Sequence, residues 1–233
     1  MLKRTISEPA WLMIGVGAIL ILSGIDPVAD RYTWFLETLP VMIGLTVLAS
    51  TRPDFPLTPL LYRLLALHAV ILIIGGYYTY AEVPLFNWLR DTLELSRNHY
   101  DRVGHFVQGF VPAILAREIL LRRSPLQPGR WLFAICVCFC LAFSAFYELI
   151  EWWVALLSDE AAESFLGTQG DPWDTQTDMF LALIGSIIAL FSLSAVHDRQ
   201  LTRLGPVSTN RIGPVAPEKA SIKARGERFG HSK

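Results

Sequence analysis

Six side chains that could transfer protons or hold a metal ion fall in three short segments of the chain. Each segment holds two of them, three or four residues apart, so within a helix each pair lies on one face. Carboxylates and an imidazole can act as general acid and general base when their surroundings separate their proton affinities. We therefore predict these six as catalytic residues. They are Asp101, His105, Glu148, Glu151, Asp174 and Asp178.

Four further polar residues lie beside these pairs and could bind a substrate. Two of them are arginines before and after Asp101, and an arginine can clamp a phosphate or carboxylate group through two parallel hydrogen bonds. A glutamine continues the helical face of Asp101 and His105, and a second glutamine precedes the last pair. The predicted substrate-binding residues are Arg97, Arg102, Gln108 and Gln169.

A divalent metal ion is an alternative use of the same residues. Carboxylates with one imidazole could hold Zn²⁺, Mn²⁺ or Mg²⁺. The chain lacks the His-Glu-x-x-His spacing that marks many zinc enzymes, so no motif identifies a metal. If the site holds a metal, we expect its ligands to be His105, Glu148 and Asp178.

The elements that position these residues are predicted to be membrane-spanning helices. Of the 233 residues, 52% are hydrophobic and only 18% are charged, and the mean hydropathy is +0.40. A soluble domain of this length carries more charge. The apolar residues form long runs, and about 20 helical residues cross a bilayer core of ~30 Å. The six runs cover 9–25, 32–49, 64–80, 103–116, 131–147 and 179–196.

The basic residues predict how these helices are oriented. Four segments that share one side of a six-span arrangement hold 16 of the 20 lysines and arginines. Because cytoplasmic loops retain basic residues, we expect this side, and both termini, to be cytoplasmic. The four segments are 1–9, 50–63, 117–130 and 197–233.

The predicted fold is an all-α, polytopic membrane bundle of six transmembrane helices. The transmembrane domain is expected to cover residues 1–198. Residues 199–233 are basic and lack an apolar period, so we expect a disordered cytoplasmic tail.

This topology brings the three pairs to one level at the extracytoplasmic side. The span that carries Glu148 runs outward, and Glu148 lies ~26 Å beyond the start of that span at 1.5 Å per residue. The spans that contain His105 and Asp178 begin at the same side, whereas the inner halves of the spans are nearly purely apolar. Ionisable residues within spans usually face a bundle interior or a water-filled cavity. We therefore predict one outward-opening pocket, with these three side chains within ~10 Å of one another.

The start of the last span also predicts a helix cap. Asp171 suits the position before the helix, and Pro172 suits the first helical position. Asp174 then falls in the first turn, where a carboxylate meets the positive end of the helix dipole.

Three segments carry a resemblance to a known family. They read RNHYDRVGHFVQGFVPA at 97–113, YELIEW at 147–152 and FLGTQGDPWDTQTDM at 165–179. They resemble the YjdF-like family of bacterial inner-membrane proteins, a domain of unknown function, over most of the chain up to about Leu193. The resemblance implies a multi-pass protein of the bacterial inner (plasma) membrane and implies no activity.

A more distant resemblance is to the VanZ-like membrane proteins, which are associated with glycopeptide antibiotic resistance. Their pattern has Asp-x-x-x-His-Phe opening one span, a Glu-rich stretch in the next, and Asp-x-x-x-Asn-x-x-Gly in the last. Ala182 stands where that pattern has Asn, and Glu151 stands where Gln is frequent. The resemblance implies a shared helical core. The matching residues are Asp101, His105, Phe106, Glu148, Asp178 and Gly185.

The leading hypothesis is an integral inner-membrane protein whose outward-facing acidic and histidine pocket binds or modifies an envelope or lipid-linked molecule. Whether it is an enzyme stays open, since the residues fit both binding and catalysis. The expected partners are membrane lipids and such a small molecule, and no nucleic acid. The alternatives are a transporter or proton-coupled carrier, and a structural protein whose polar cluster only joins helices. A transport path needs polar residues through the whole membrane depth, and the chain has no internal repeats.

Overall fold

The computed structural model describes residues 7–157 and 168–204, and these residues are helical with no β-strand among them. A 3₁₀ turn, η1 (Tyr80–Glu82), and a short helix, α4 (Pro84–Thr92), separate the third long helix from the fourth, and no apolar run predicts either. The long helices are α1 (Glu8–Ser23), α2 (Arg31–Thr51), α3 (Pro59–Tyr78), α5 (Tyr100–Arg123), α6 (Arg130–Leu157) and α8 (Asp174–Leu204).

Each of the six apolar runs overlaps one long helix, which confirms the all-α expectation for the described residues. Four of these helices, α2, α3, α6 and α8, are long and apolar enough to cross a membrane. Helix α1 is apolar but has only 16 residues. Helix α5 has 24 residues but carries polar side chains along its length, so composition alone does not mark it as a span.

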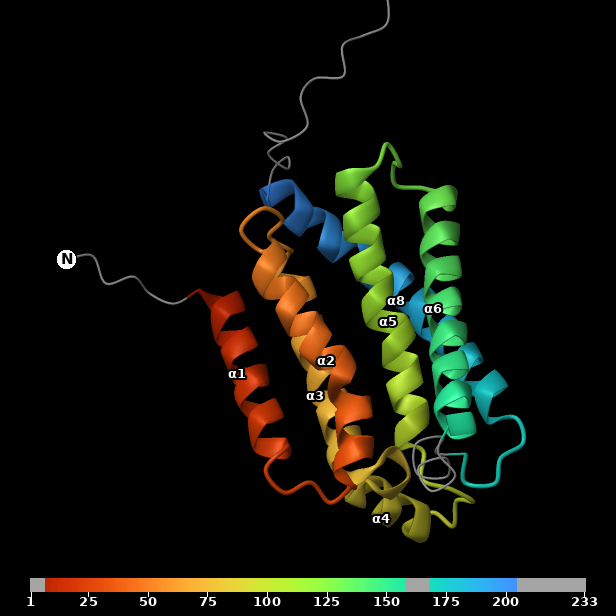
Figure 1. Cartoon of the computed structure of the whole chain (residues 1–233). Coiled ribbons are helices and arrows are strands. Elements are labelled where there is room, and N and C mark those ends of the chain that lie inside the picture. Colours follow the sequence, from red (N-terminus) through yellow and green to blue (C-terminus); the bar gives the residue numbers. More distant parts are fainter. Residues whose placement is uncertain (1–6, 158–167, 205–233) are drawn as a thin grey trace, which may run out of the picture.

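The long helices form two groups that share a contact. Helices α1 and α2 pack on α3, whereas α5, α6 and α8 pack on one another, and α3 joins the groups by packing on α5. Connections alternate between two ends of the bundle (Figure 1). The end with residues 24–30, 79–99 and 168–173 is called the Asp101 end below, and the end with residues 52–58 and 124–129 the Glu118 end.

Side-chain caps set the starts of two helices. Asp30 precedes α2, and its Oδ1 accepts hydrogen bonds from the backbone N–H groups of Tyr32 at 2.9 Å and Thr33 at 3.0 Å. Thr58 precedes α3, which has Pro59 at its first position. Such caps satisfy N–H groups that have no partner within the helix.

The apolar core lies between α3, α5, α6 and α8. Leu61 and Ile114 are fully buried in it, together with Cys136 and Cys140 of α6. Cys138 points away and is exposed. Cys136 and Cys140 therefore serve as small packing residues on one face of α6.

Two glycines allow α5 and α8 to cross in backbone contact. A methyl group on Gly109 would overlap the carbonyl oxygen of Ala182, and one on Gly185 would overlap the carbonyl oxygen of Phe106. Gly185 is also a residue that matches the VanZ-like pattern. The structure gives a physical reason for glycine there, because only glycine lets the two backbones approach this closely.

Helix α8 differs from the prediction at both ends. It begins at Asp174, and residues 172–173 form a turn in which Asp171 Oδ1 accepts a hydrogen bond from the Trp173 N–H at 2.9 Å. Asp171 therefore caps this turn rather than the helix. At the other end α8 continues to Leu204, beyond the boundary expected at residue 198, and the rest of the expected tail lies outside the described residues.

Candidate functional site

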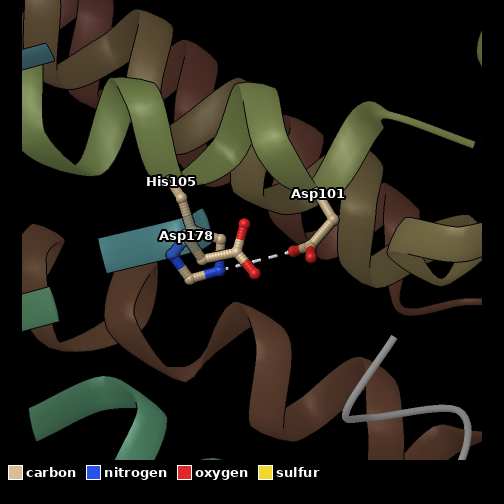
Figure 2. Close-up of side chains that lie close together, drawn as sticks. All are labelled: Asp101, His105 and Asp178. Carbon is tan, nitrogen blue, oxygen red and sulfur yellow. Dashed lines mark ion pairs between the residues drawn. The ribbon is translucent and has the colours of Figure 1, made fainter. Parts of the chain in front are cut away.

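Asp101 and His105 of α5 and Asp178 of α8 form a buried cluster near the Asp101 end of the bundle. Figure 2 shows the imidazole ring and the two carboxylates turned toward one another. One nitrogen or oxygen atom from each residue lies within 4.8 Å of the others. His105 Nε2 is 3.5 Å from Asp101 Oδ1, as expected for residues four apart on one helix face. Two helices that cross at glycines thus supply three groups with acid–base and metal-binding chemistry.

Glu148 of α6 reaches the same cluster. Its Oε1 lies 3.7 Å from His105 Nδ1, and its side chain is buried. The expected proximity of His105, Glu148 and Asp178 is therefore confirmed. The pocket expected to be lined by all three stays a prediction, because the cavity described below is lined by His105 but not by Glu148 or Asp178. Their catalytic roles remain a prediction.

Gln108 holds the imidazole ring from the other side. His105 Nδ1 lies 3.0 Å from Gln108 Oε1. A carboxamide oxygen can only accept a hydrogen bond, so Nδ1 carries a proton and donates it. In the neutral ring this leaves a lone pair on Nε2, the atom that faces Asp101. The predicted substrate-binding glutamine thus orients the histidine.

The arginines of the Asp101 end are paired with aspartates. Arg97 is buried and forms ion pairs with Asp174 and, at 3.7 Å, with both Asp101 and Asp171. Arg102 contacts Asp171 at 2.5 Å. Asp171 and Asp174 thus obtain counter-charges from Arg97, which precedes α5, and from Arg102, which lies within it. A substrate-clamping role for the two arginines stays a prediction.

Asp174 therefore lies apart from the cluster, although it is one helical turn from Asp178. Its carboxylate turns to Arg97, whereas Asp178 turns to His105. A helix spacing of four residues predicts a shared face, but the partners across the bundle decide where each carboxylate goes.

Gln169 ties two segments together and does not contact the cluster. Its side chain accepts a hydrogen bond from the Asn98 backbone N–H at 2.9 Å and donates one to the Asn98 carbonyl oxygen at 3.0 Å. The Asn98 side chain is fully buried, and its amide group donates hydrogen bonds to the carbonyl oxygen of Val83, just before α4, and to the side-chain oxygen of Asn87 within α4. Asn98 and Gln169 thus fix the loop before α8 against the start of α5.

Glu151 lines a large cavity rather than joining the cluster directly. The cavity has a volume of about 790 Å³ and is lined by residues of α1, α2, α3, α5 and α6. Most of its lining is apolar, and most of its polar groups lie toward the Asp101 end, although His68 lines its middle and Thr51 and Arg123 line it at the Glu118 end. Asp101 and His105 belong to both the cluster and this lining. The polar lining residues at that end are Glu37, Tyr80, Asp101, His105, Gln108, Tyr147 and Glu151.

Three of these lining residues are absent from the predicted site. Glu37 is buried in α2, and a lone carboxylate within an apolar run was a signal that could have found it. Tyr80 and Tyr147 carried no such signal, because tyrosines are common in membrane helices near the interface.

A second polar cluster occupies the Glu118 end, and it corrects the expectation that the inner halves of the spans are nearly purely apolar. Glu118 is fully buried and accepts hydrogen bonds from the Thr58 N–H at 3.1 Å, the Thr58 hydroxyl at 2.8 Å and Arg122 at 2.7 Å. His197 Nε2 lies 3.0 Å from Glu118, while its Nδ1 faces Arg117 at 2.8 Å. Since the guanidinium can only donate, Nδ1 accepts and Nε2–H donates.

The two clusters differ in whether their carboxylate oxygens are paired. Both oxygens of Glu118 have partners, and the unpaired buried atom near them is Arg122 Nε. In contrast, Asp178 Oδ1 and Glu148 Oε1 are buried without a hydrogen-bond partner. Buried polar atoms are nearly always paired, so the unpaired oxygens distinguish the cluster at the Asp101 end as a candidate binding site.

The comparisons with known proteins agree with this membrane architecture. The chain is 50% identical over 190 residues to the inner membrane protein YjdF of Escherichia coli (strain K12), covering 82% of this chain and 90% of the relative. No solved structure matches the chain. The apolar helices and this relative make it a multi-pass inner-membrane protein. Because the family model described as "Predicted membrane protein (DUF2238)" matches residues 8–199, the chain belongs to the DUF2238 family.

Proposed function

We propose that the protein crosses the inner membrane six times, with both termini in the cytoplasm and the Asp101 end facing outward. Helices α1 and α5 lie alongside the four candidate spans, and the connections alternate between the two ends (Figure 1). The basic residues concentrate at the Glu118 end, which the positive-inside rule assigns to the cytoplasm.

On this topology, the outward-facing site binds a lipid-linked envelope molecule. The observation that carries this proposal is the cavity of about 790 Å³, a volume within the range of small-molecule sites. Its long apolar part suits a hydrocarbon chain, and its polar end suits a head group beside Asp101 and His105. Such a ligand would enter from the membrane and present its polar part to the periplasmic side.

Exposed apolar residues mark the mouth of the cavity. Ile43 and Val47 of α2 and Phe143 and Phe146 of α6 line it, and all four are also exposed on the bundle surface. In a bilayer these residues face lipid, so a chain can enter sideways between α2 and α6. Sideways entry keeps the hydrocarbon out of water throughout binding.

Acid–base modification of the bound head group is a second candidate function. It is favoured by the 3.5 Å approach of His105 Nε2 to Asp101, beside the cavity lining. Once Nε2 takes up a proton, the Asp101 carboxylate stabilises the charged ring, which is a recurrent arrangement for proton transfer.

The alternative functions fit the described residues less well. For a transporter, the two polar clusters would need a polar path between them, but the residues between them along α5 and α8 include Val111, Ile114 and Ala189, which are apolar and buried. For a purely structural cluster, the carboxylates would be expected to find partners, as Glu118 does. The unpaired oxygen of Asp178 argues instead for a ligand.

Filling the cavity tests the proposal. Gly44 lines it, and a Cβ atom added there has no atom within 4 Å. Gly44→Phe should therefore fold normally and exclude the ligand. Native mass spectrometry of protein released from membranes should show a lipid adduct on the wild type and at least about a tenfold lower occupancy on the variant, a change of about 1.4 kcal/mol in binding.

Gly17→Phe is the matched control. Gly17 lies in α1, also has no atom within 4 Å of an added Cβ, and does not line the cavity. This control should keep the adduct. Equal lipid occupancy on the wild type and both variants would refute binding in the cavity.

A further inference from the structure

We propose that Asp101, His105 and Asp178 bind one divalent transition-metal cation, of the Zn²⁺ or Mn²⁺ class, inside the helix bundle. The ligand set expected from the sequence was His105, Glu148 and Asp178. In the set proposed here, Asp101 takes the place of Glu148. The site does not depend on the proposed lipid, because its three ligand residues come from the protein alone.

The geometry of the three groups suits a single ion. Their candidate ligand atoms all lie within 4.8 Å of one another. Two ligands on opposite sides of a divalent cation are about 4 to 5 Å apart, given metal–ligand distances of about 2.0 to 2.6 Å. Small side-chain movements thus suffice to bring three donors around one ion, with positions left for further ligands.

The imidazole is already oriented as a metal ligand. Its Nδ1–H donates to Gln108 Oε1 at 3.0 Å, and its Nε2 points to the carboxylates. Metal-binding histidines usually donate their other N–H in this way, which fixes the tautomer and the ring orientation. A nitrogen ligand beside two carboxylates favours Zn²⁺ or Mn²⁺ over Ca²⁺ or Mg²⁺, which prefer oxygen alone.

The unpaired oxygen of Asp178 points to a ligand independently of the cluster's composition. The Asp178 side chain is only 2% exposed, and its Oδ1 makes no hydrogen bond. Figure 2 shows this carboxylate beside His105 and Asp101. Leaving a buried carboxylate oxygen unpaired is costly, and a bound cation removes that cost.

The charges around the cluster also favour a cation. The two carboxylates of the cluster and the nearby Glu148 can carry three negative charges, whereas the one histidine can carry a single positive charge. Arg97 forms an ion pair with Asp101, but its closest partner is Asp174. A dication would balance the remaining negative charge at the position where the donors converge.

Metal analysis of the purified protein tests this site. The protein should be isolated with an affinity tag that contains no histidine, and then titrated with ZnCl₂ or MnCl₂ after chelation. Elemental analysis should give about one ion per wild-type chain, and the ion should raise the unfolding temperature. Asp178→Asn and His105→Gln should abolish both effects, and Gln108→Ala should weaken metal affinity about 10- to 100-fold.

Two variants act as controls. Asp171→Asn, which alters a carboxylate outside the cluster, should bind metal as the wild type does. Gly44→Phe should also keep the metal, even when it excludes lipid, so the two proposals can fail separately. Wild-type protein that takes up neither ion and shows no change in unfolding temperature would overturn the site, as would equal uptake by Asp178→Asn. If the substituted proteins do not accumulate, the titration of the wild type alone decides.

Discussion

Glu118→Ala is expected to destabilise the protein by about 3–5 kcal/mol, because it removes one member of a buried ionic network and leaves the others unpaired. Glu118 receives hydrogen bonds from Thr58, Arg122 and His197, and so joins the start of α3 to α5 and α8. Thermal and denaturant unfolding in detergent should show the loss directly.

The matched comparison is the exposed acid of the same network. Asp198 pairs with Arg117 at 2.8 Å, but its side chain is 47% exposed. Asp198→Ala should cost no more than about 1 kcal/mol, as for other exposed ion pairs. Similar losses for the two variants would show that the Glu118 network does not hold the helices together.

Asp178→Asn is expected to separate function from stability. Its buried carboxylate lacks a hydrogen-bond partner for Oδ1, so a neutral side chain of the same shape should relieve that cost. In metal-free protein we expect the variant to match the wild type or to exceed it by about 1–3 kcal/mol. Functional sites often carry such a stability cost.

The same substitution should abolish biological function. In a strain that lacks the chromosomal gene, the Asn variant should accumulate in the membrane and fail to restore the wild-type phenotype. Asp171→Asn should restore it, because Asp171 lies outside the cluster. A fully active Asp178→Asn protein, or one less stable than the wild type in the absence of metal, would refute a functional role for this carboxylate.

The helices were largely predictable from the sequence because hydrophobic runs and membrane thickness both constrain them. The runs locate all six long helices, and the alternation of basic segments predicts which connections share an end. Helix α4 escaped prediction, since it has no apolar run and lies among polar residues at one end of the bundle.

The site was predictable only to the level of its position along the helices. The spacing of Asp174 and Asp178 places both on one face of α8, yet Arg97 engages the first and the His105 cluster the second. That choice depends on how α8 is rotated and on its contact with α5 at Gly109. Neither is readable from one segment's spacing.

The network at the Glu118 end depends on contacts between distant segments. His197 pairs with residues about 80 positions earlier in the chain, so a lone histidine near the end of a span gave no sign of its partners. The charges of Arg117 and Glu118 at the end of an apolar run were the available signal. The sequence could not tell whether they were satisfied.

The central claim is that a specific lipid-linked molecule occupies the cavity, and site-specific photo-crosslinking in membranes tests it most directly. Phe143 lines the cavity, whereas Phe139, one turn earlier on α6, is exposed and does not line it. A photoreactive phenylalanine analogue at each position should capture different molecules. The account predicts one predominant lipid-linked species at position 143 and a mixture that mirrors bulk membrane lipids at position 139. The same bulk mixture at both positions would contradict it.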